Sequence, residues 1–234
     1  MGRLDKATLL KSEKKGLATV RMYEDSGMAY IVKPRVGRGH RVDRASRDAG
    51  DNQRIAAHRN RRNLILLVRK NRPTHFVTLT FSKPTEPREA VSAWHELAGR
   101  WRKRFRGFYV RVGEVSDEKN LHFHVLCSKD VAEYLQVHWT HGFVDSQKVH
   151  FSDLGRICSY MAKDFGDSNR PFRRRYVASK GAKPKFEEMH YETMNEALDG
   201  VTDLSQDVRS TLEISLTQTA FGEFGEVTWQ PLQR

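Results

Sequence analysis

Two histidines alternate with a phenylalanine in the segment NLHFHVL, residues 120–126. Successive side chains of a β-strand point to opposite faces, so His122 and His124 share a face if this apolar segment is a strand. Two adjacent imidazoles can bind a metal ion together, and they can equally be hydrogen-bonded core residues. A metal site therefore requires a third ligand elsewhere in the chain.

Glu114 is the candidate third ligand, eight residues before His122 in the apolar segment 108–116. This segment and residues 121–127 are predicted to form a β-hairpin. A loop of three or five residues would place Glu114 opposite His122 on the same face, whereas a loop of four would turn it away. A carboxylate buried in an apolar strand is unfavourable unless it is paired or binds a ligand. Alternatively, Glu114 lies at the end of the strand and faces solvent. Two imidazoles and one carboxylate would suit Mn²⁺ or Mg²⁺.

Tyr160 and Lys163 could supply a nucleophile and its helper. Residues 153–165 are predicted to form an amphipathic helix, with Ser152 as its N-cap and Gly166 ending it. Arg156, Tyr160 and Lys163 share one edge of that helix. A tyrosine at such a border is often a core-edge residue, but a nearby ammonium group could stabilise a phenolate or a negatively charged phosphorane. Together with a metal-held phosphate, the pattern indicates phosphoryl transfer through a phosphotyrosine.

The surrounding segments alternate between helical and strand patterns. Helices are predicted for residues 51–70, 88–105 and 130–139. Strands are predicted for residues 75–81, 108–116, 121–127, 175–180 and 211–217, with 142–149 a short strand or a loop. Because a hairpin interrupts the alternation, we expect an α+β fold: a central, largely antiparallel β-sheet flanked by helices, and not a doubly wound parallel sheet.

The charge is distributed unevenly along the chain. The formal net charge is +12, but residues 186–234 carry ten acidic and two basic residues, which leaves +20 on residues 1–185. We expect three parts: a basic N-terminal arm (1–50) with at most one hairpin, a catalytic domain (51–185), and an acidic C-terminal segment (186–234) that can pack on the same domain. The excess of positive charge favours a polyanion such as nucleic acid as the partner.

Basic residues lie both within the tyrosine segment and after it. We expect phosphate contacts from five side chains: Arg156, Arg173, Arg174, Arg175 and Lys180. Phe172 and Tyr176 could stack on bases beside them. In a generic protein, such a run is a solvated surface.

The remaining sequence features concern the cellular compartment and a second pair of histidines. Two cysteines, Cys127 and Cys158, are too few for a disulfide framework, which fits a reducing cytosol. With neither a signal peptide nor a membrane span in the pattern, we expect a cytoplasmic protein. His138 and His141 have metal-like spacing, but the glycine that follows them indicates a packed turn.

Three segments resemble, in order and spacing, the motifs of a known family. FVTLTF (76–81), HFHVL (122–126) and YMAKDF (160–165) are similar to the three motifs of the HUH endonucleases. The similarity is to the single-domain rolling-circle replication initiators of bacterial plasmids and filamentous phages. It covers about residues 62–185, because RRYVASKG (174–181) also resembles the stretch after the tyrosine motif. The resemblance implies an antiparallel sheet with the histidine strand at its centre and the tyrosine on a helix facing it.

The resemblance also implies a reaction. Tyr160 would attack a phosphate of single-stranded DNA, stay linked to the 5′ end, release a 3′-hydroxyl primer, and later rejoin strands. His122, His124 and Glu114 would hold the divalent metal, and Lys163 would assist. Asp164 occupies the place of the second tyrosine that some relatives carry, which favours a single-tyrosine cycle.

The implied partners are single-stranded or hairpin origin DNA and the polymerase of a bacterial host. Many viral relatives carry a helicase, but this sequence contains no GxxxxGK[ST] motif. A host helicase would therefore have to unwind the duplex. Three alternatives stay open. The chain could be a relaxase or transposase with the same chemistry, a phosphoesterase that uses histidines directly, or a non-catalytic basic module that binds DNA or RNA.

Overall fold

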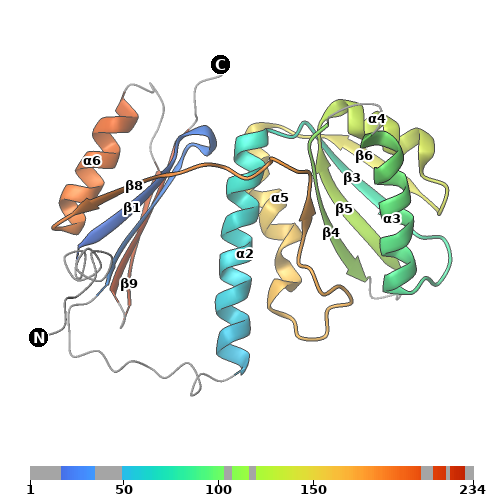
Figure 1. The fold of residues 1–234 in the computed structure, drawn as a ribbon, viewed down its shortest axis with the longest axis horizontal. Helices are drawn as coiled ribbons and strands as arrows, with labels where there is room; N and C mark the ends of the chain where they lie inside the picture. Colours follow the sequence, from blue (N-terminus) through green and yellow to red (C-terminus); the bar gives the residue numbers. More distant parts are fainter. Residues whose placement is uncertain are drawn as a thin grey trace, which may run out of the picture. The chain divides into compact units, whose positions relative to one another are not determined.

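The computed structural model describes residues 17–34, 49–102, 107–115, 120–206, 213–219 and 222–229 (Figure 1). The chain divides into two compact units, residues 48–183 and the two flanking stretches 1–47 and 184–234. Each unit contains one antiparallel β-sheet with helices packed on it. The α+β class expected from the sequence is confirmed.

The central unit is built on a five-stranded sheet with the histidine strand in the middle. Every neighbouring pair of strands in it is antiparallel. The order across the sheet is β6 (Val144–Lys148), β3 (His75–Thr80), β5 (Leu121–Cys127), β4 (Tyr109–Val115) and β7 (Val177–Ala178). The predicted hairpin is the β4–β5 pair, and β5 carries both histidines of the HFH motif.

Helices cover both faces of this sheet (Figure 1). One face packs on α3 (Pro87–Arg102) and α4 (Lys129–His138), and the other on α2 (Ala49–Asn71) and α5 (Leu154–Met161). Side chains of β5 point to both faces of the sheet. Phe123 packs in the core beneath α3 and α4, and Leu126 packs in the core beneath α2 and α5. In the sequence of α3, Trp94, Ala98 and Trp101 recur at helical spacing and so predict an apolar stripe, and all three are buried. Phe105 continues that spacing but is outside the described residues.

The tyrosine segment is shorter as a helix than the sequence predicts. The α-helix α5 begins at Leu154, after a 3₁₀ turn at Phe151–Asp153, so Ser152 is not its N-cap. It ends at Met161, and a second 3₁₀ turn, η4 (Lys163–Gly166), follows. The amide of Ala162 bonds to both Cys158 and Tyr160 carbonyls, which tightens the chain and directs Phe165 into the core. Likewise, the strand predicted over 175–180 is reduced to the two residues of β7.

Gly113 allows a close contact that supports the site strand β4. A Cβ atom at this position would lie 2.2 Å from Cε2 of Phe172, far inside van der Waals contact. Phe172 is buried there against Phe123, with ring centroids 5.6 Å apart. The segment after the tyrosine turn is therefore anchored on β4 next to Glu114.

The flanking stretches form the second unit. Its strand order is β8 (Glu187–Tyr191), β1 (Ala18–Tyr23), β2 (Met28–Pro34), β10 (Gly222–Thr228) and β9 (Glu213–Thr219). Helix α6 (Met194–Gln206) covers one face through Ala197 and Val201. The predicted N-terminal hairpin is β1–β2, and its turn through Glu24–Ser26 ends at Gly27 with φ 61°. This hairpin pairs with strands of the acidic C-terminal segment, so the two ends of the chain share one sheet.

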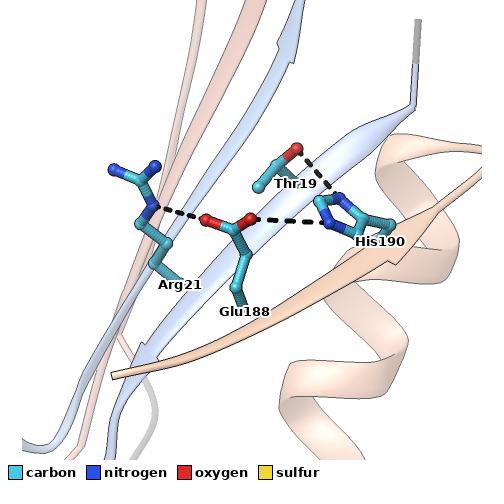
Figure 2. A network of polar contacts seen from close by, with 4 residues as sticks. All are labelled: Thr19, Arg21, Glu188 and His190. Atoms are coloured by element: carbon cyan, nitrogen blue, oxygen red, sulfur yellow. Dashed lines mark hydrogen bonds and ion pairs between the residues drawn. The ribbon is translucent and has the colours of Figure 1, made fainter. Parts of the chain in front are cut away.

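Polar contacts across β1 and β8 join the two ends further (Figure 2). Arg21 Nε donates to Glu188 Oε2 at 3.0 Å, and His190 Nε2 lies 3.5 Å from Glu188 Oε1. Thr19 Oγ1 and His190 Nδ1 are 3.2 Å apart. Because the Arg21 side chain is half exposed, the ion pair adds little stability, and the backbone ladder and the apolar face hold the sheet.

Candidate metal centre and tyrosine site

The register of the β4–β5 hairpin places Glu114 opposite His122. Val115 pairs with Leu121, so the loop is the five-residue segment 116–120, of which residues 116–119 are outside the described residues. This is one of the two loop lengths that were expected to bring Glu114 onto the histidine face. Glu114, His122 and His124 offer ligand atoms that all lie within 4.8 Å of one another. Among the described residues, these three form the one such group.

His124 is held by polar contacts on both ring nitrogens. Nε2 lies 3.0 Å from Glu114 Oε2, and Nδ1 lies 3.2 Å from the Thr78 hydroxyl oxygen. The ring of Phe76 stacks on His124 with centroids 5.4 Å apart. His124 is only 5% exposed, and burial lowers its pKa, so the neutral imidazole is the favoured form. Neutral imidazole is also the form that binds metals.

The three side chains fit a divalent metal. Two imidazoles and a carboxylate supply nitrogen and oxygen donors of the kind that Mn²⁺ accepts, and Mg²⁺ binds the carboxylate oxygen. All three come from two paired strands, whose backbone ladder fixes their spacing. Thr78 on β3 orients His124 from behind, as partners of metal-binding histidines do.

Lys163 contacts both the carboxylate and the tyrosine. Its Nζ lies 2.5 Å from Glu114 Oε1, and the hydrogen bond to Glu114 raises the lysine pKa. The same nitrogen lies 4.7 Å from the centroid of the Tyr160 ring. Lys163 therefore remains beside Tyr160 although the helix ends before it.

Tyr160 is exposed next to the metal-ligand group. Its side chain is 46% exposed, and its ring lies 5.3 Å from the ring of His124 in an edge-to-face arrangement. The structure thus brings the predicted metal ligands together with the predicted nucleophile and its helper. The five residues are Glu114, His122, His124, Tyr160 and Lys163. An exposed phenol beside clustered metal-ligand groups has the arrangement that nucleophilic attack on a bound phosphate requires.

The predicted basic residues have different surroundings. Arg156 is exposed on α5 and lies 3.5 Å from Asp153 Oδ1. Arg175 Nε donates to the Phe165 carbonyl at 2.8 Å, and Arg174 lines a cavity beside Glu114. Arg173 and Lys180 are exposed and do not line that cavity.

Phe172 and Tyr176 were expected to stack on bases; the expectation for Phe172 was wrong, and the expectation for Tyr176 stays a prediction. Phe172 is only 8% exposed because it packs on Phe123 and Gly113, so it is not an open stacking surface. Tyr176 is half-buried against Phe165, with ring centroids 6.4 Å apart. Both rings belong to the segment between η4 and β7.

Other contacts near the site were not anticipated from the sequence. Thr78 and Phe76 belong to the FVTLTF segment, and alternation along that strand against the histidine strand could have identified them as the neighbours of His124. Arg61 of α2 donates to Ser159 Oγ at 2.8 Å, which adds a basic side chain next to Tyr160. His138 lies 4.1 Å from the Tyr134 ring, and His141 packs near Trp139, as expected for a packed turn.

The comparisons with known proteins agree with the location of this site. Residues 74–166 match the family described as replication-associated protein ORF2/G2P. The match covers less than half of the chain, and it runs from the start of β3 to the end of η4, so it contains all five gathered residues. Searches among curated proteins and among solved structures found no match. None of the described helices is long and apolar enough to cross a membrane.

Proposed function

We propose that this protein is a rolling-circle replication initiator that nicks single-stranded DNA at an origin with Tyr160 as the nucleophile. The observation that carries the proposal is the meeting of an exposed tyrosine, a lysine and a His-His-Glu group on one face of the sheet. The similarity of residues 74–166 to replication-associated proteins supports the DNA substrate. The net charge of +12 supports binding of a polyanion.

Glu114, His122 and His124 would hold the divalent cation, Mn²⁺ or Mg²⁺. When bound, the cation would act as a Lewis acid on a phosphate oxygen. The protein's own contribution is to present two imidazoles and one carboxylate from a paired hairpin, with His124 kept in position by Thr78.

Tyr160 would make the new covalent bond. Its phenolic oxygen attacks phosphorus, the bond from phosphorus to the 3′ oxygen breaks, and the 5′ end stays on the tyrosine as a phosphodiester. The proton lost by the phenol and the proton gained by the 3′ oxygen balance through solvent. Lys163 supplies a positive charge near the ring, which stabilises phenolate and the charge on the phosphorane. Attack of a 3′-hydroxyl on the phosphotyrosine reverses the reaction and rejoins strands.

The proposed setting is a bacterial cytoplasm, with single-stranded or hairpin origin DNA as the substrate. The free 3′-hydroxyl would prime a host polymerase, and a host helicase would unwind the duplex. Phosphate contacts are assigned to the exposed side chains of Arg156, Arg173, Arg174 and Lys180, together with Arg175.

A covalent adduct tests the proposal. The protein is incubated with a mixed pool of single-stranded and hairpin DNA in Mn²⁺, and a denaturing gel is examined for a protein–DNA adduct. We expect an adduct whose attachment maps to Tyr160 and which is absent with a chelator and in Tyr160→Phe. Tyr176→Phe is the matched control, because this second tyrosine is half-buried against Phe165 and should leave the adduct unchanged. Attachment elsewhere, or salt-sensitive binding without an adduct from any pool, would favour a non-catalytic binding module.

A further inference from the structure

A cavity of about 260 Å³ opens beside the metal-ligand group. The end of strand β4, from Val112 to Val115, forms one wall, and η4 with the segment that follows it forms the other. Glu114 belongs to both the cavity and the metal-ligand group. An occupant of the cavity would therefore lie directly next to a phosphate held at that group.

Positive and negative side chains both border the cavity. Arg170 and Arg175 are held by the backbone, Arg170 through the Asp167 carbonyl at 2.9 Å and Arg175 through the Phe165 carbonyl. Arg174 is exposed at the same cavity. The carboxylates are those of Glu114, Asp164 and Asp167.

The carboxylates of the cavity can accept hydrogen bonds. Asp164 and Asp167 are exposed side chains that line it. An N–H group placed in the cavity would bond to one of these carboxylates. The guanidinium groups on the other side are donors only and require acceptors.

Apolar side chains form another part of the cavity wall. Met161, Phe165 and Phe172 are buried side chains that also line it, and Val112 belongs to the same wall. A bare phosphate would meet three carboxylates and these apolar groups, and an aliphatic group would leave the charged groups without partners. A nucleobase has apolar faces and an edge that carries both donors and acceptors, so it fits both parts of the wall.

We infer that this cavity binds the base of one nucleotide of the DNA strand, next to the phosphate that Tyr160 would attack. The inference rests on the proposed function for the DNA substrate and adds a base-reading position to it. Arginine donors and aspartate acceptors along the wall would discriminate between bases, because a wrong base edge would leave fewer of these groups paired.

The test separates base binding from phosphate binding. Full-length Tyr160→Phe protein with a chelator is titrated with fluorescent single-stranded oligonucleotides of about 12 nucleotides, the length of one binding site. One set contains oligo(dT), oligo(dC) and oligo(dA), and the comparison strand carries the same phosphates on abasic tetrahydrofuran units. We expect at least one base-containing strand to bind about 5- to 100-fold more tightly than the abasic strand, as one base contact provides.

A neighbouring pair of variants locates the base. Asn169 lines the cavity and Ser168 does not, and both are exposed, so Asn169→Trp and Ser168→Trp add the same bulk at adjacent positions. We expect Asn169→Trp to change the ratio of base-containing to abasic affinity, and Ser168→Trp to leave it as it is in the parent protein. Equal ratios in the two variants would overturn the inference.

A photochemical cross-link gives a second readout. Oligo(dT) with one 5-iododeoxyuridine is irradiated with the same protein, and the modified peptide is identified by mass spectrometry. Cross-links to residues that line the cavity, such as Phe165, Phe172 or Met161, support the inference, and cross-links confined to residues outside the lining overturn it.

Failure of this inference is distinguishable from failure of the proposed function, because the binding assays require no cleavage. A Tyr160 adduct without any effect of Asn169→Trp would overturn the base cavity alone. If Asn169→Trp changes base-dependent binding but the wild-type protein forms no adduct, the base cavity is supported and the proposed nicking reaction is overturned. Absence of binding to every strand would overturn both.

Discussion

Lys163 Nζ lies 2.5 Å from Glu114 Oε1, while the other oxygen of the same carboxylate lies 3.0 Å from His124 Nε2. Glu114 is thus shared between a lysine and a candidate metal ligand. A cation that binds Glu114 must tolerate or displace the ammonium group, and an ammonium released from Glu114 is already within reach of Tyr160. The contact links occupancy of the metal-ligand group to the charge beside the nucleophile.

Replacing Lys163 should therefore have opposite effects on binding and on chemistry. In Lys163→Met, Mn²⁺ affinity measured by calorimetry should rise by about fivefold, the upper range for a partly exposed ion pair, because a competing positive charge is removed. Formation of the adduct should fall, because the charge near Tyr160 is lost. Lys129→Met is the control, since Lys129 is exposed on α4 and lies outside the metal-ligand group. Unchanged or weaker Mn²⁺ binding in Lys163→Met would show that the lysine does not compete.

Glu114→Gln should weaken metal binding by about tenfold or more, because it removes the one anionic donor among the three side chains. Calorimetric titration with Mn²⁺ measures the effect, and the adduct assay should show a parallel loss. Glu133→Gln is the matched control, since Glu133 is exposed on α4 and pairs with Lys129 at 3.5 Å. Equal Mn²⁺ affinities for the two variants would exclude Glu114 as a ligand.

Thr78→Val tests the support of His124. The substitution keeps the shape of the side chain and removes the hydroxyl that bonds to Nδ1. We expect Mn²⁺ affinity to fall by about 10- to 100-fold, the range found when such partners are removed. Thr74→Val removes a similar hydroxyl contact, to His75 Nδ1 at 2.9 Å, but outside the metal-ligand group, and should leave the affinity unchanged. A similar loss in both variants would point to a general effect on strand β3.

Gly113→Ala should destabilise the central unit. The added Cβ would lie 2.2 Å from the Phe172 ring, which is itself packed on Phe123, so the ring must move. Overpacking of this kind lowers the free energy of unfolding by about 1–3 kcal/mol. Urea unfolding measures the change. Gly99→Ala is the control, because its Cβ would meet nothing within 4 Å and alanine favours the helix; that variant should be unchanged or slightly more stable.

Both cysteines should be unreactive in the folded protein. Burial raises the pKa of Cys127 and of Cys158 to about 12, so almost no thiolate is present near pH 8. A thiol reagent such as dithionitrobenzoate should label neither residue until urea unfolds the chain. Because the folded pKa values exceed the unfolded value of about 8.5, stability should be retained below that pH and lost progressively as pH rises toward 12. Rapid labelling of the folded protein at pH 8 would contradict the packing of both side chains.

The sequence by itself determined most of the central fold and the members of the site. Alternation in the histidine strand placed His122 and His124 on one face, and the helical spacing of the α3 stripe identified the buried tryptophans. These features follow from local periods, 2 for strands and 3.6 for helices, which a single segment displays without reference to the rest of the chain. Tyr160 and Lys163 are close in sequence, so their proximity was also accessible from the sequence.

Only the tertiary structure decided which distant groups meet. The position of Glu114 depended on the length of a loop, and a change of one residue would have turned it to the other face. Thr78 and Phe76 reach His124 through strand pairing, and Arg61 reaches Ser159 through packing of α2 on α5.

Local sequence patterns likewise could not predict that the two ends of the chain pair in one sheet. Charge divides residues 1–185 from residues 186–234, but the hydrogen-bonded ladder joins β1 to β8 and β2 to β10 across more than 150 positions of sequence. Pairing between strands that are far apart depends on which edges and apolar faces remain to be covered once the local elements have formed. That is a property of the packed chain and not of any one segment.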